Sequence, residues 1–583
     1  MGKKLVIIGG GVSGLSAGIY GSRAGFDTVV LEKNSTAGGS CSGWYRKGYA
    51  IDNCLHWLTG TKEGTEVYDM WTELGVLGPD VKQITRDCFW SSETDGVVVT
   101  LWPDAEKSRR EWLEISPEDE MEINAFFDVV GLANDMVTVN PTAKELVQTA
   151  HSHQTLLSRK DFMKKAMQYL GIRNYDWVKK FKSKAIQNLI LDFCPKEYES
   201  YWLMLSYSFY VSGNGNIIDG GSIKMAEILV KSLKEAGGTL KTGCPVKKVV
   251  IERKTQKITE VVKDGFSDGI SAGAAATVSK EIALELKADL KESIVRKAKG
   301  VLLENGDFIE ADYVICACDV NYTFENLINS KYAPVTLKEI YKNRLSYTFY
   351  SAFQVAFAVD GEFEEVPDSL SFACEPIDAA YETYDRIGIK NYRKYGDYIA
   401  PKGKTVIQVS LDQYEKDCKY WRRLYNKDRG EYTRAKENIA DAIMNAIVNR
   451  FPQYEGKLDV LDVWTPYSYQ RRNNDTHGAF MRFITTAFSL NSFLSLEIKG
   501  LDNVYLSGHW MKYPGGVPMA AATGKDAVNL IIEKEKSREA AKEMIKKFSE
   551  KVTNNPPVNA AKNAIKKVSK EEVKNNRRKR DNA

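Results

Sequence analysis

The glycine-rich turn at the start of the chain constrains the fold more than any other feature. Residues 3–8, Lys-Lys-Leu-Val-Ile-Ile, have the composition of a buried parallel strand. Residues 9–14 then read Gly-Gly-Gly-Val-Ser-Gly, which contains Gly-x-Gly-x-x-Gly, and residues 15–24 follow a helical pattern. In such a unit the first glycine permits the tight turn, the second lets a pyrophosphate approach the backbone, and the third allows close helix–strand packing. The helix N-terminus attracts the phosphate charge. The turn therefore predicts a dinucleotide site.

An acidic residue at the expected distance supports this interpretation. A second apolar strand, residues 28–31, ends at Glu32, which lies 18 residues after Gly14. An acid at that place accepts hydrogen bonds from a ribose hydroxyl. A purely structural glycine-rich turn would explain the glycines but not the acid. We expect the neighbouring Val12, Ser13 and Lys33 to share the site.

Length and charge limit the classes of protein that the chain can represent. A chain of 583 residues is too long for one simple core, so two or more domains are expected. The formal net charge of +4 is small for this length and does not indicate a nucleic-acid partner. Residues 534–583 hold 16 Lys and Arg against 7 Asp and Glu, so this end of the chain is basic. Such a tail can contact an anionic membrane as a peripheral protein does, and a solvated, partly disordered tail is the alternative that we prefer.

The cysteines and the hydropathy indicate a cytoplasmic protein. Nine cysteines are dispersed without a Cys-x-x-Cys pair, which suits reduced thiols. Cys316 and Cys318 share one apparent strand, and burial is preferred over zinc because zinc needs further ligands nearby, so no metal is predicted. No apolar stretch is long enough to cross a bilayer, and the N-terminus lacks the cleavage pattern of a signal peptide.

The order of predicted elements indicates a discontinuous cofactor-binding domain. Its strands come from both ends and the middle of the chain, at residues 1–75, 215–325 and 500–534, with an exposed, partly helical excursion at 255–298. The substrate domain is inserted as residues 76–214 and 326–499, and residues 535–583 form the tail. The predicted elements are helices at 222–236, 434–450 and 519–534, a hairpin around Asn305-Gly306, a second sheet from 347–359 and 405–411, and a buried strand at 505–508.

Four segments together resemble the carotenoid (phytoene) desaturase branch of the FAD-dependent flavin amine oxidase superfamily. They are residues 9–32, 38–56, 220–246 and 500–534. The branch is favoured by Gly48-Tyr49-x-x-Asp52 with a following His56, and by Leu506-x-Gly508-His509-Trp510 with Pro514-Gly515-Gly516-Val517-Pro518. Flavin-dependent retinol saturases and carotene isomerases look similar in these segments.

The resemblance implies one FAD and an α/β fold in which a Rossmann-type FAD-binding domain carries an inserted mixed-sheet and helical substrate domain. A helix that starts near Val517 would direct backbone N–H groups at the isoalloxazine O2 and stabilise a reduced, anionic flavin. Many relatives carry Arg after the paired glycines, and this chain departs from that pattern with Ser40. The implied contacts are Gly9, Gly11 and Gly14 at the pyrophosphate, Glu32 at the adenosine ribose, Gly38, Gly39 and Ser40 beside phosphate and flavin, the Val246 backbone at the adenine, and Gly508 and Val517 at the flavin.

Other conspicuous residues have two interpretations each. His56 is a catalytic candidate, over the flavin or orienting the substrate, or else a structural histidine beside Trp57. Asp52 is favoured as a hydrogen-bonded anchor of its loop. The aromatic residues between Trp177 and Tyr210, among them Tyr201, Trp202 and Tyr207, form plain core or line an apolar substrate tunnel. Of the remaining histidines, His509 with Trp510 is expected to contact the flavin, His477 to be exposed in a turn, and His151 and His153 to lie at the surface.

These features predict an FAD-dependent oxidoreductase. It transfers hydride between flavin and a carbon–carbon bond of an apolar, polyene-like or other isoprenoid substrate, in a direction that cannot be read. Only one dinucleotide fingerprint is visible, because Gly213-Asn214-Gly215 lacks the third glycine, so electrons would leave to oxygen, a quinone or a separate carrier. The alternatives are a flavin-dependent saturase or isomerase, an amine or porphyrinogen oxidase, and a GDP-dissociation-inhibitor-like scaffold without flavin. The intact segment 515–518 argues against the scaffold.

Overall fold

A computed structural model defines the architecture for residues 2–133, 164–165, 168–169, 171–256, 293–479, 481–484, 494–512 and 515–553. His151, His153 and residues 554–583 of the predicted tail lie outside the described residues. Within these ranges no helix combines the length and the apolar character that a membrane span requires.

A five-stranded parallel sheet forms the centre of the half of the molecule that contains the chain start. Its order is β19-β13-β1-β2-β9, so the strand that precedes the glycine turn is the central one. The apolar residues of β1 are almost entirely buried, as expected for a parallel sheet covered on both faces. The strands are β1 (Lys4–Ile8), β2 (Asp27–Leu31), β9 (Thr239–Lys241), β13 (Tyr313–Cys316) and β19 (Val504–Leu506).

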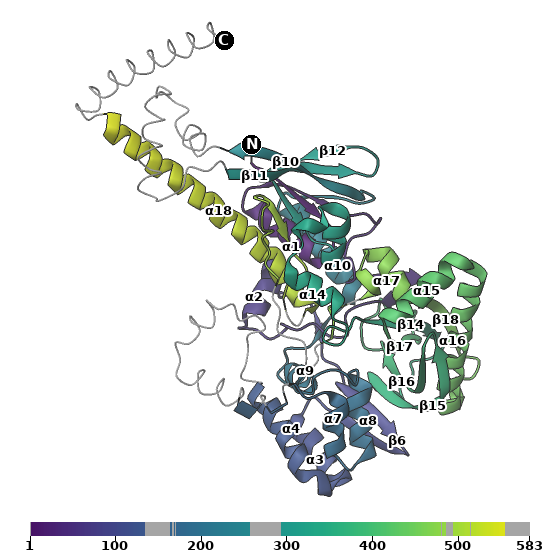
Figure 1. Ribbon diagram of the computed structural model, residues 1–583. Coiled ribbons are helices and arrows are strands. Elements are labelled where there is room, and N and C mark those ends of the chain that lie inside the picture. Colours follow the sequence, from purple (N-terminus) through teal and green to yellow (C-terminus); the bar gives the residue numbers. More distant parts are fainter. Residues whose placement is uncertain are drawn as a thin grey trace.

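Three helices pack close to this sheet: α1 (Val12–Arg23), α10 (Gly221–Glu235) and α18 (Gly516–Thr553). Two glycines allow the closest approaches. A Cβ at Gly14 would lie 1.9 Å from the Gly9 carbonyl oxygen, and a Cβ at Gly524 of α18 would lie 2.4 Å from the Ser13 carbonyl oxygen. The helix predicted at 519–534 is present as part of α18. This helix is longer than predicted and extends beyond the body of the molecule (Figure 1).

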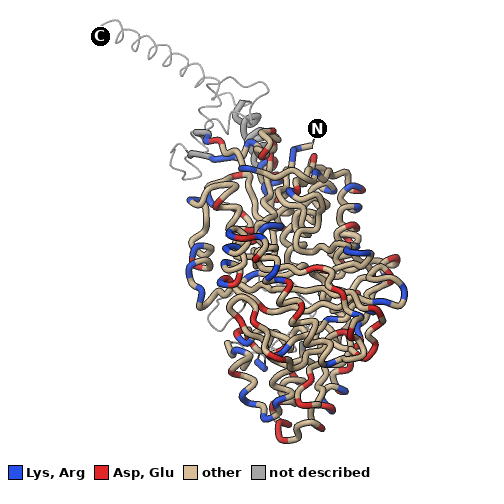
Figure 2. Tube along the Cα trace, turned by 90° about the vertical axis from the view of Figure 1, so that its right-hand side faces the viewer, with Lys and Arg blue, Asp and Glu red and all other residues tan. Residues whose placement is uncertain are grey.

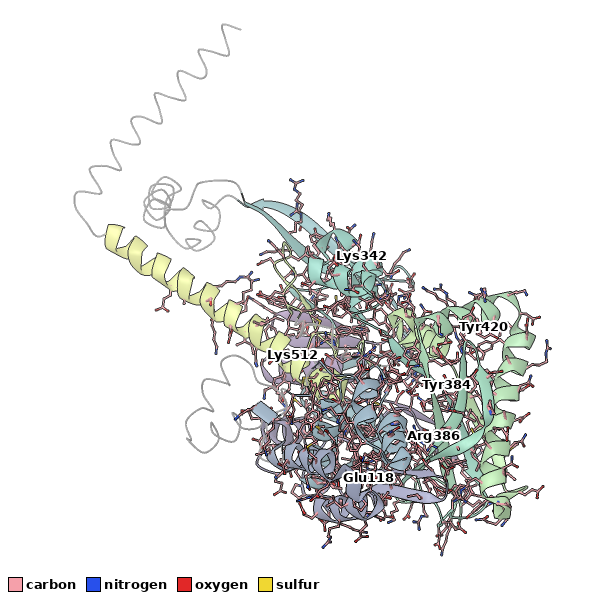
Figure 3. All side chains as sticks on the ribbon, turned by 60° about the horizontal axis from the view of Figure 1, so that its bottom comes forward. Glu118, Lys342, Tyr384, Arg386, Tyr420 and Lys512 are labelled. Carbon is pink, nitrogen blue, oxygen red and sulfur yellow. The ribbon has the colours of Figure 1, made fainter. Side chains whose placement is uncertain are left out.

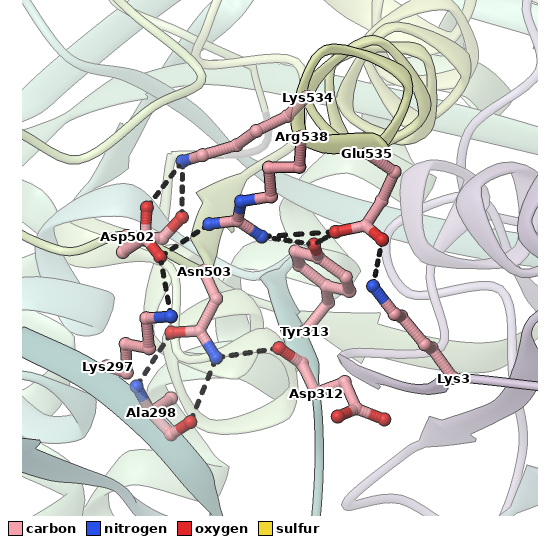
Figure 4. A network of polar contacts seen from close by, with 10 residues as sticks. All are labelled: Lys3, Lys297, Ala298, Asp312, Tyr313, Asp502, Asn503, Lys534, Glu535 and Arg538. Carbon is pink, nitrogen blue, oxygen red and sulfur yellow. Dashed lines mark hydrogen bonds and ion pairs between the residues drawn. The ribbon is translucent and has the colours of Figure 1, made fainter. Parts of the chain in front are cut away.

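A polar network holds α18 against the sheet (Figure 4). Asp502, just before β19, forms ion pairs with Lys534, Arg538 and Lys297. Glu535, which directly follows Lys534 on α18, bonds to Lys3 near the chain start. Single surface ion pairs contribute little to stability, but a network of shared partners restricts how the helix can move.

An antiparallel three-stranded sheet, β10 (Val246–Gln256), β11 (Ser293–Leu303) and β12 (Phe308–Glu310), lies beside the parallel sheet. The predicted hairpin around Asn305-Gly306 is confirmed, because β11 pairs with β12 across it. The bounds predicted for the excursion, 255 to 298, are too wide. Residues 255–256 and 293–298 continue the β10–β11 ladder, since pairing to the partner strand overrides their polar composition. Residues 257–292 lie outside the described part.

A seven-stranded mixed sheet forms the second half, in the order β18-β14-β17-β16-β15-β6-β7. The second sheet predicted from 347–359 and 405–411 is confirmed, and these stretches pair with each other as β14 and β17. Figure 1 shows α15 and α16 beside this sheet and a group of helices below it. The strands are β6 (Trp90–Thr94), β7 (Val97–Leu101), β14 (Tyr350–Val359), β15 (Ser369–Ala379), β16 (Glu382–Asn391), β17 (Thr405–Tyr414) and β18 (Leu458–Trp464).

The helices of this half divide into two sets. α15 (Glu415–Lys427) and α16 (Arg429–Arg450) bury apolar residues in one core cluster with β14, β15, β16 and β17. A separate aromatic-rich core unites α3 (Ala105–Ile115), α4 (Glu120–Ala133), α7 (Asn174–Trp177), α8 (Lys184–Phe193) and α9 (Tyr201–Val211). Smaller elements are α2 (Glu66–Glu73), α13 (Val320–Tyr322), α14 (Val335–Lys342), α17 (Pro466–Asn473), β3 (Gly43–Arg46), β4 (Tyr49–Asp52), β5 (Gln83–Ile84) and β8 (Ile217–Ile218).

Charged residues of both signs are intermingled along the trace (Figure 2). This distribution agrees with the small net charge.

Candidate cofactor and substrate site

A cavity of about 680 Å³ joins the two halves of the molecule. One end lies at the carboxyl ends of β1, β2 and β13, where open α/β sheets bind ligands. The other end is floored by β14, β15, β16 and β17 of the seven-stranded sheet. The predicted site residues that line it are Gly9, Gly11, Val12, Ser13, Glu32, Lys33, Gly38, Gly39, Ser40, His56, Val246, Gly508 and Val517.

Glu32 and the glycine turn form one hydrogen-bonded unit. Oε2 of Glu32 accepts the Gly10 N–H at 2.8 Å, and Oε1 accepts the N–H and side-chain amide of Asn34, both at 2.8 Å. The carboxylate is only 5% exposed but still faces the cavity. Gly14 does not line the cavity. It packs against Gly9, which brings helix and strand together, and its place at the pyrophosphate stays a prediction.

The paired glycines form the opposite wall of this end. The Gly38 N–H donates to the Gly10 carbonyl oxygen at 2.8 Å, and Gly38 bridges to Gly11. A Cβ at Gly39 would lie 3.1 Å from the Gly11 Cα, so two glycine loops are in direct contact. Ser40 Oγ accepts a hydrogen bond from the Asn473 side-chain amide at 2.9 Å, which gives that hydroxyl a structural partner.

α17 brings a cation to this end that sequence reasoning missed. Arg472 lines the cavity, and its Nη2 donates to Thr36 Oγ1 at 3.2 Å while its Nε is buried with no hydrogen-bond partner among the described residues. Lys33 lines the same wall and bonds to Asn474 Oδ1 at 2.6 Å. Arg472 lies about 430 residues further along the chain than the paired glycines, and no local pattern indicates that it reaches this site.

A buried pair of carboxyl groups was also missed. Asp319, the N-cap of α13, accepts the Tyr322 N–H and the Thr476 hydroxyl on Oδ1. Its Oδ2 and that of Asp475 are buried without a hydrogen-bond partner in the described part of the chain, and both residues line the cavity. Burial raises the pKa of Asp319 to about 6, and burial together with the neighbouring Asp319 raises the pKa of Asp475.

The N-terminus of α18 opens onto the cavity, as predicted for the flavin end. Gly516, Val517 and Pro518 line the wall, and a Cβ at Gly508 would meet nothing within 4 Å. His509 and Trp510 line the same region, which agrees with the expectation that they lie at this end. Burial, and then the charge of Arg482, lower the pKa of His509 to about 4, so its ring is neutral at physiological pH.

His56 lines the cavity and is half-buried. Burial lowers its pKa well below the ordinary value, and the charges of Lys390 and Arg86 act in the same direction. A neutral imidazole can hydrogen-bond a ligand without adding charge. The predicted anchor role of Asp52 is confirmed, because its carboxylate accepts from Ser222, Cys54 and Leu55.

The floor of the substrate half is more polar than the sequence suggested. Figure 3 shows Tyr384 and Arg386 on this sheet, beside the helical layer. Arg386 forms a two-pronged ion pair with Asp192 of α8. The polar cavity-lining residues of the sheet strands are Gln354, Ser371, Arg386, Lys390, Gln408, Ser410 and Asp412.

The aromatic group divides between the two predicted roles. Trp177, Tyr207 and Tyr210 are buried in the core of the helical layer and do not line the cavity. Trp202 does line it. Trp57, Trp90, Phe193, Tyr198 and Phe209 complete the aromatic wall.

His477 differs from its predicted exposure in a turn. It has left-handed backbone (φ 62°), yet its side chain is only 22% exposed and lies 3.6 Å from a Glu415 oxygen. The turn is present, but the ring packs on Phe349, which covers it. His477 does not line the cavity.

The residues present fit an FAD. Glycine backbone borders the cavity at the turn after β1 and at Gly508, where there is room for a ligand beside the main chain. Buried polar atoms are left without protein partners along the same wall among the described residues, including Asp319 Oδ2, Asp475 Oδ2 and His509 Nε2. An elongated molecule with phosphate, ribityl and heteroaromatic groups would satisfy such atoms, whereas a dry apolar ligand would leave them unpaired.

Comparisons with known proteins agree with this geometry. Residues 7–74 match the NAD(P)-binding Rossmann-like domain, and residues 290–532 match the flavin-containing amine oxidoreductase family. The chain is 22% identical to phytoene desaturase of Neurospora crassa, over 91% of this chain and 85% of the relative. It is 19% identical to 4,4'-diaponeurosporene oxygenase of Staphylococcus aureus, over 92% and 99% respectively.

A solved structure supports the fold. Putrescine oxidase bound to putrescine superposes with a TM-score of 0.52 at 12% identity, covering 91% of this chain and 99% of that one. The fold and the site thus define a flavoenzyme with a Rossmann-type nucleotide domain. The resemblance to the carotenoid-desaturase-like branch of the flavin amine oxidase superfamily is confirmed, and the protein is an FAD-dependent oxidoreductase.

Proposed function

We propose that the protein transfers hydride between FAD and a carbon–carbon bond of an isoprenoid, polyene-like chain. The observation that carries the proposal is the single cavity that runs from the glycine turn to the sheet of the other half. A cofactor bound at the first end leaves the aromatic-walled second end for an elongated substrate. The names of the two relatives with wide coverage, a phytoene desaturase and a 4,4'-diaponeurosporene oxygenase, favour a polyene over an amine.

The residues proposed to hold the cofactor follow its length. Gly9, Gly11, Val12 and Ser13 would face the pyrophosphate at the N-terminus of α1, where backbone N–H groups and the helix dipole favour negative charge. Glu32 would accept from the adenosine ribose, and the Val246 backbone would meet the adenine. Lys33 and Arg472 would add positive charge, while Gly38, Gly39, Ser40, Gly508 and Val517 would border the phosphate and flavin.

FAD supplies the hydride acceptor or donor when it is bound. The chain's own groups then position the substrate and exclude water. The rings of Trp57, Phe193 and Phe209 give an apolar wall against which a conjugated chain can lie flat. Neutral His56 would orient the substrate over the flavin rather than carry charge. The residues thus act mainly by orientation and desolvation, which hydride transfer needs.

The test is anaerobic reduction of the FAD-loaded protein. Phytoene in detergent micelles should bleach the visible flavin band and yield a more conjugated product, if the enzyme works as a desaturase. If it works as a saturase, lycopene should reoxidise dithionite-reduced enzyme. Bleaching by putrescine or benzylamine, with no response to either polyene, would instead support an amine oxidase. An isomerase would convert a polyene without net bleaching.

We further propose that oxygen, a quinone or a separate carrier accepts the electrons in the oxidative half-reaction, if the enzyme works as a desaturase. Adding menadione or air to the substrate-reduced protein would distinguish a quinone from oxygen by the rate at which the visible band returns. Contact of the basic C-terminal end with an anionic membrane stays a prediction, and co-sedimentation with phosphatidylglycerol vesicles would test it.

A further inference from the structure

Three hydrogen-bond donors gather on the floor of the substrate half. Lys390 on β16, Ser371 on β15 and Trp90 at the start of β6 all line the cavity. Ser371 pairs with Gly388 and Ser369 pairs with Lys390, so Ser371 is the diagonal neighbour of Lys390. Such neighbours lie about 7–8 Å apart at the backbone, within reach of a lysine side chain.

Gly388 lies beside Ser371 and the indole ring of Trp90. A Cβ at Gly388 would lie 3.0 Å from Ser371 Oγ and 3.3 Å from Trp90 Cζ2, so the strand has no side chain where the serine and the indole approach it. The group of Trp90, Ser371 and Lys390 is called the donor cluster below. It comes from three strands of one sheet, so the sheet register fixes its shape.

The donors of this cluster lack good acceptors. Within the described ranges, Ser371 Oγ and Trp90 Nε1 are buried and make no hydrogen bond. Lys390 is 8% exposed, and among the described residues its Nζ donates to the Leu55 carbonyl oxygen at the long distance of 3.5 Å. Unsatisfied buried donors are rare and costly, so a cluster of them at a cavity wall indicates a missing acceptor.

The charges that face Lys390 do not replace that acceptor. Asp52 is occupied by Ser222 and by two backbone N–H groups, and Asp368 accepts from the Asp87 N–H. Arg86 adds a further positive charge, and neutral His56 adds no charge. Cys54 also lies near Lys390. The rings of Tyr392 and Tyr395 lie 5.1 and 5.2 Å from Nζ. Burial, then the charge of Arg86, lower the pKa of Lys390 well below its ordinary value.

We propose that the donor cluster binds a carbonyl-type oxygen of the substrate, so that the substrate is an oxygen-bearing isoprenoid and not a plain hydrocarbon. The inference rests on the proposed function and names its substrate class more closely. One acceptor oxygen with two lone pairs, near Gly388, satisfies donors that a hydrocarbon would leave buried and unpaired. A site built to hydrogen-bond a substrate group discriminates strongly against the analogue that lacks it.

The oxygen also sets the position of the chain along the cavity. Lys390 lies directly opposite Gln408 in the ladder and bonds to the loop that carries His56. An oxygen held there fixes which carbon–carbon bond lies toward the flavin end, because the chain beyond it can only follow the aromatic wall. The cluster therefore acts on specificity and on the site of reaction.

Binding of a matched probe series to the FAD-loaded full chain tests the proposal. The probes are β-farnesene, farnesol, farnesylacetone and farnesoic acid, with dissociation constants from the perturbation of the visible flavin spectrum. Farnesylacetone or farnesoic acid should bind at least about tenfold more tightly than β-farnesene, the effect of one good hydrogen bond. Proton uptake on binding would identify the carboxylate as the preferred form, and its absence the neutral carbonyl. Equal binding of β-farnesene, farnesylacetone and farnesoic acid would overturn the proposal.

Variants locate the effect. Lys390→Met and Ser371→Ala should each weaken binding of the preferred oxygenated probe about tenfold and leave β-farnesene unchanged. Lys436→Met is the matched control, because Lys436 is also partly buried, bonds to a backbone carbonyl (Val463) and lies over a tyrosine ring, yet does not line the cavity. Equal weakening of all probes by Lys390→Met and Ser371→Ala would show a merely structural role and contradict the proposal. Should Lys390→Met fail to fold, Ser371→Ala alone decides.

The outcomes separate this inference from the proposed function. Selective binding of oxygenated probes without any hydride exchange between isoprenoids and the flavin would leave the donor cluster in place and remove the proposed reaction. Hydride exchange with phytoene, combined with no preference for the oxygenated probes, would support the proposed reaction and remove the proposed role of the donor cluster.

Discussion

The side chain of Glu32 accepts a hydrogen bond from the backbone N–H of Gly10 at 2.8 Å, so the acid that ends β2 is tied directly to the glycine turn that follows β1. Its second oxygen accepts two donors of Asn34. One carboxylate thus holds two loops in place and still faces the cavity. The same residue therefore serves the shape of the cofactor site and, as proposed, contacts the cofactor.

Glu32→Gln tests this double role. A glutamine has one acceptor oxygen for two sets of donors, so either Gly10 or Asn34 faces an amide NH₂. We expect the dissociation constant for FAD to rise at least about tenfold, with a loss of stability of roughly 1–3 kcal/mol. Quenching of FAD fluorescence on titration measures the first, and chemical denaturation measures the second. Glu310→Gln is the control, since Glu310 pairs with Lys4 on the surface, and unchanged FAD binding in Glu32→Gln would contradict the role.

A pair of alanine substitutions separates cofactor contact from packing. A Cβ at Gly11 would meet nothing closer than 3.8 Å within the protein, whereas a Cβ at Gly14 would lie 1.9 Å from the Gly9 carbonyl oxygen. Gly11→Ala should therefore fold with nearly unchanged stability but lose most of its FAD, because the methyl group occupies the space proposed for the pyrophosphate. Gly14→Ala should lose several kcal/mol, of the order seen for overpacked cores.

The ratio of visible to protein absorbance and the thermal midpoint, measured on the same preparations, check both variants. If Gly11→Ala kept a full complement of FAD, the pyrophosphate would have to lie elsewhere. If Gly14→Ala were as stable as the natural protein, the close packing of α1 against the turn would be wrong.

The nucleotide half could be predicted from the sequence because its signals are local. The glycine turn, the apolar strand before it and Glu32 fall within about 30 residues, and each has a direct physical reason. A second sheet could also be predicted from two long stretches with a strand pattern, which became β14 and β17. By contrast, the ends of β10 and β11 are polar in sequence and become strand only because each one pairs with the other.

The polar part of the cavity could not be predicted in this way. Trp90, Ser371 and Lys390 are far apart in sequence and meet only through the register of β6, β15 and β16. Arg472 reaches the glycine loops from α17, although nothing in its own segment marks it as a cofactor residue. A residue's role there depends on which element lies across the cavity, and that information is in the tertiary packing.

The ion pair between Arg386 and Asp192 joins the sheet to the helical layer across the cavity wall. Nε and Nη2 donate to the two oxygens at 2.9 and 2.7 Å, and the side chains are 17% and 8% exposed. Asp192→Ala should cost about 3–5 kcal/mol because it leaves the guanidinium largely buried without its carboxylate. Asp192→Leu combined with Arg386→Met should cost less, since both charges are removed together.

Chemical denaturation of the three proteins measures these differences. The exposed pair of Asp459 with Lys47 provides the control, and Asp459→Ala should change stability by no more than about 1 kcal/mol. A double variant that loses as much stability as Asp192→Ala, or more, would show that the pair does not act as a unit.

Asp319 predicts a pH dependence of stability that is opposite to the usual one for a carboxylate. Burial raises its pKa from 3.8 to about 6, so the folded state binds the proton more tightly than the unfolded state. The stability that it contributes is complete below the unfolded pKa, near 3.8, and is lost as the pH rises through about 6. His509 acts in the opposite sense, because its pKa of about 4 lies below the ordinary 6.5, and its contribution appears as the pH rises through the same window.

Asp319→Asn separates the pH dependence that Asp319 causes from the opposite contribution of His509. The amide keeps Oδ1 for the Tyr322 N–H and the Thr476 hydroxyl, so the cap of α13 survives, and it removes the charge next to Asp475. On protein freed of FAD, the variant should gain about 2–3 kcal/mol over the natural chain between pH 4 and pH 7. Asp95→Asn, at an exposed turn with left-handed backbone, should show no such difference. A constant offset between the natural chain and Asp319→Asn across this range would mean that Asp319 is already ionised at pH 4, and that its free oxygen has a partner when the protein is in solution.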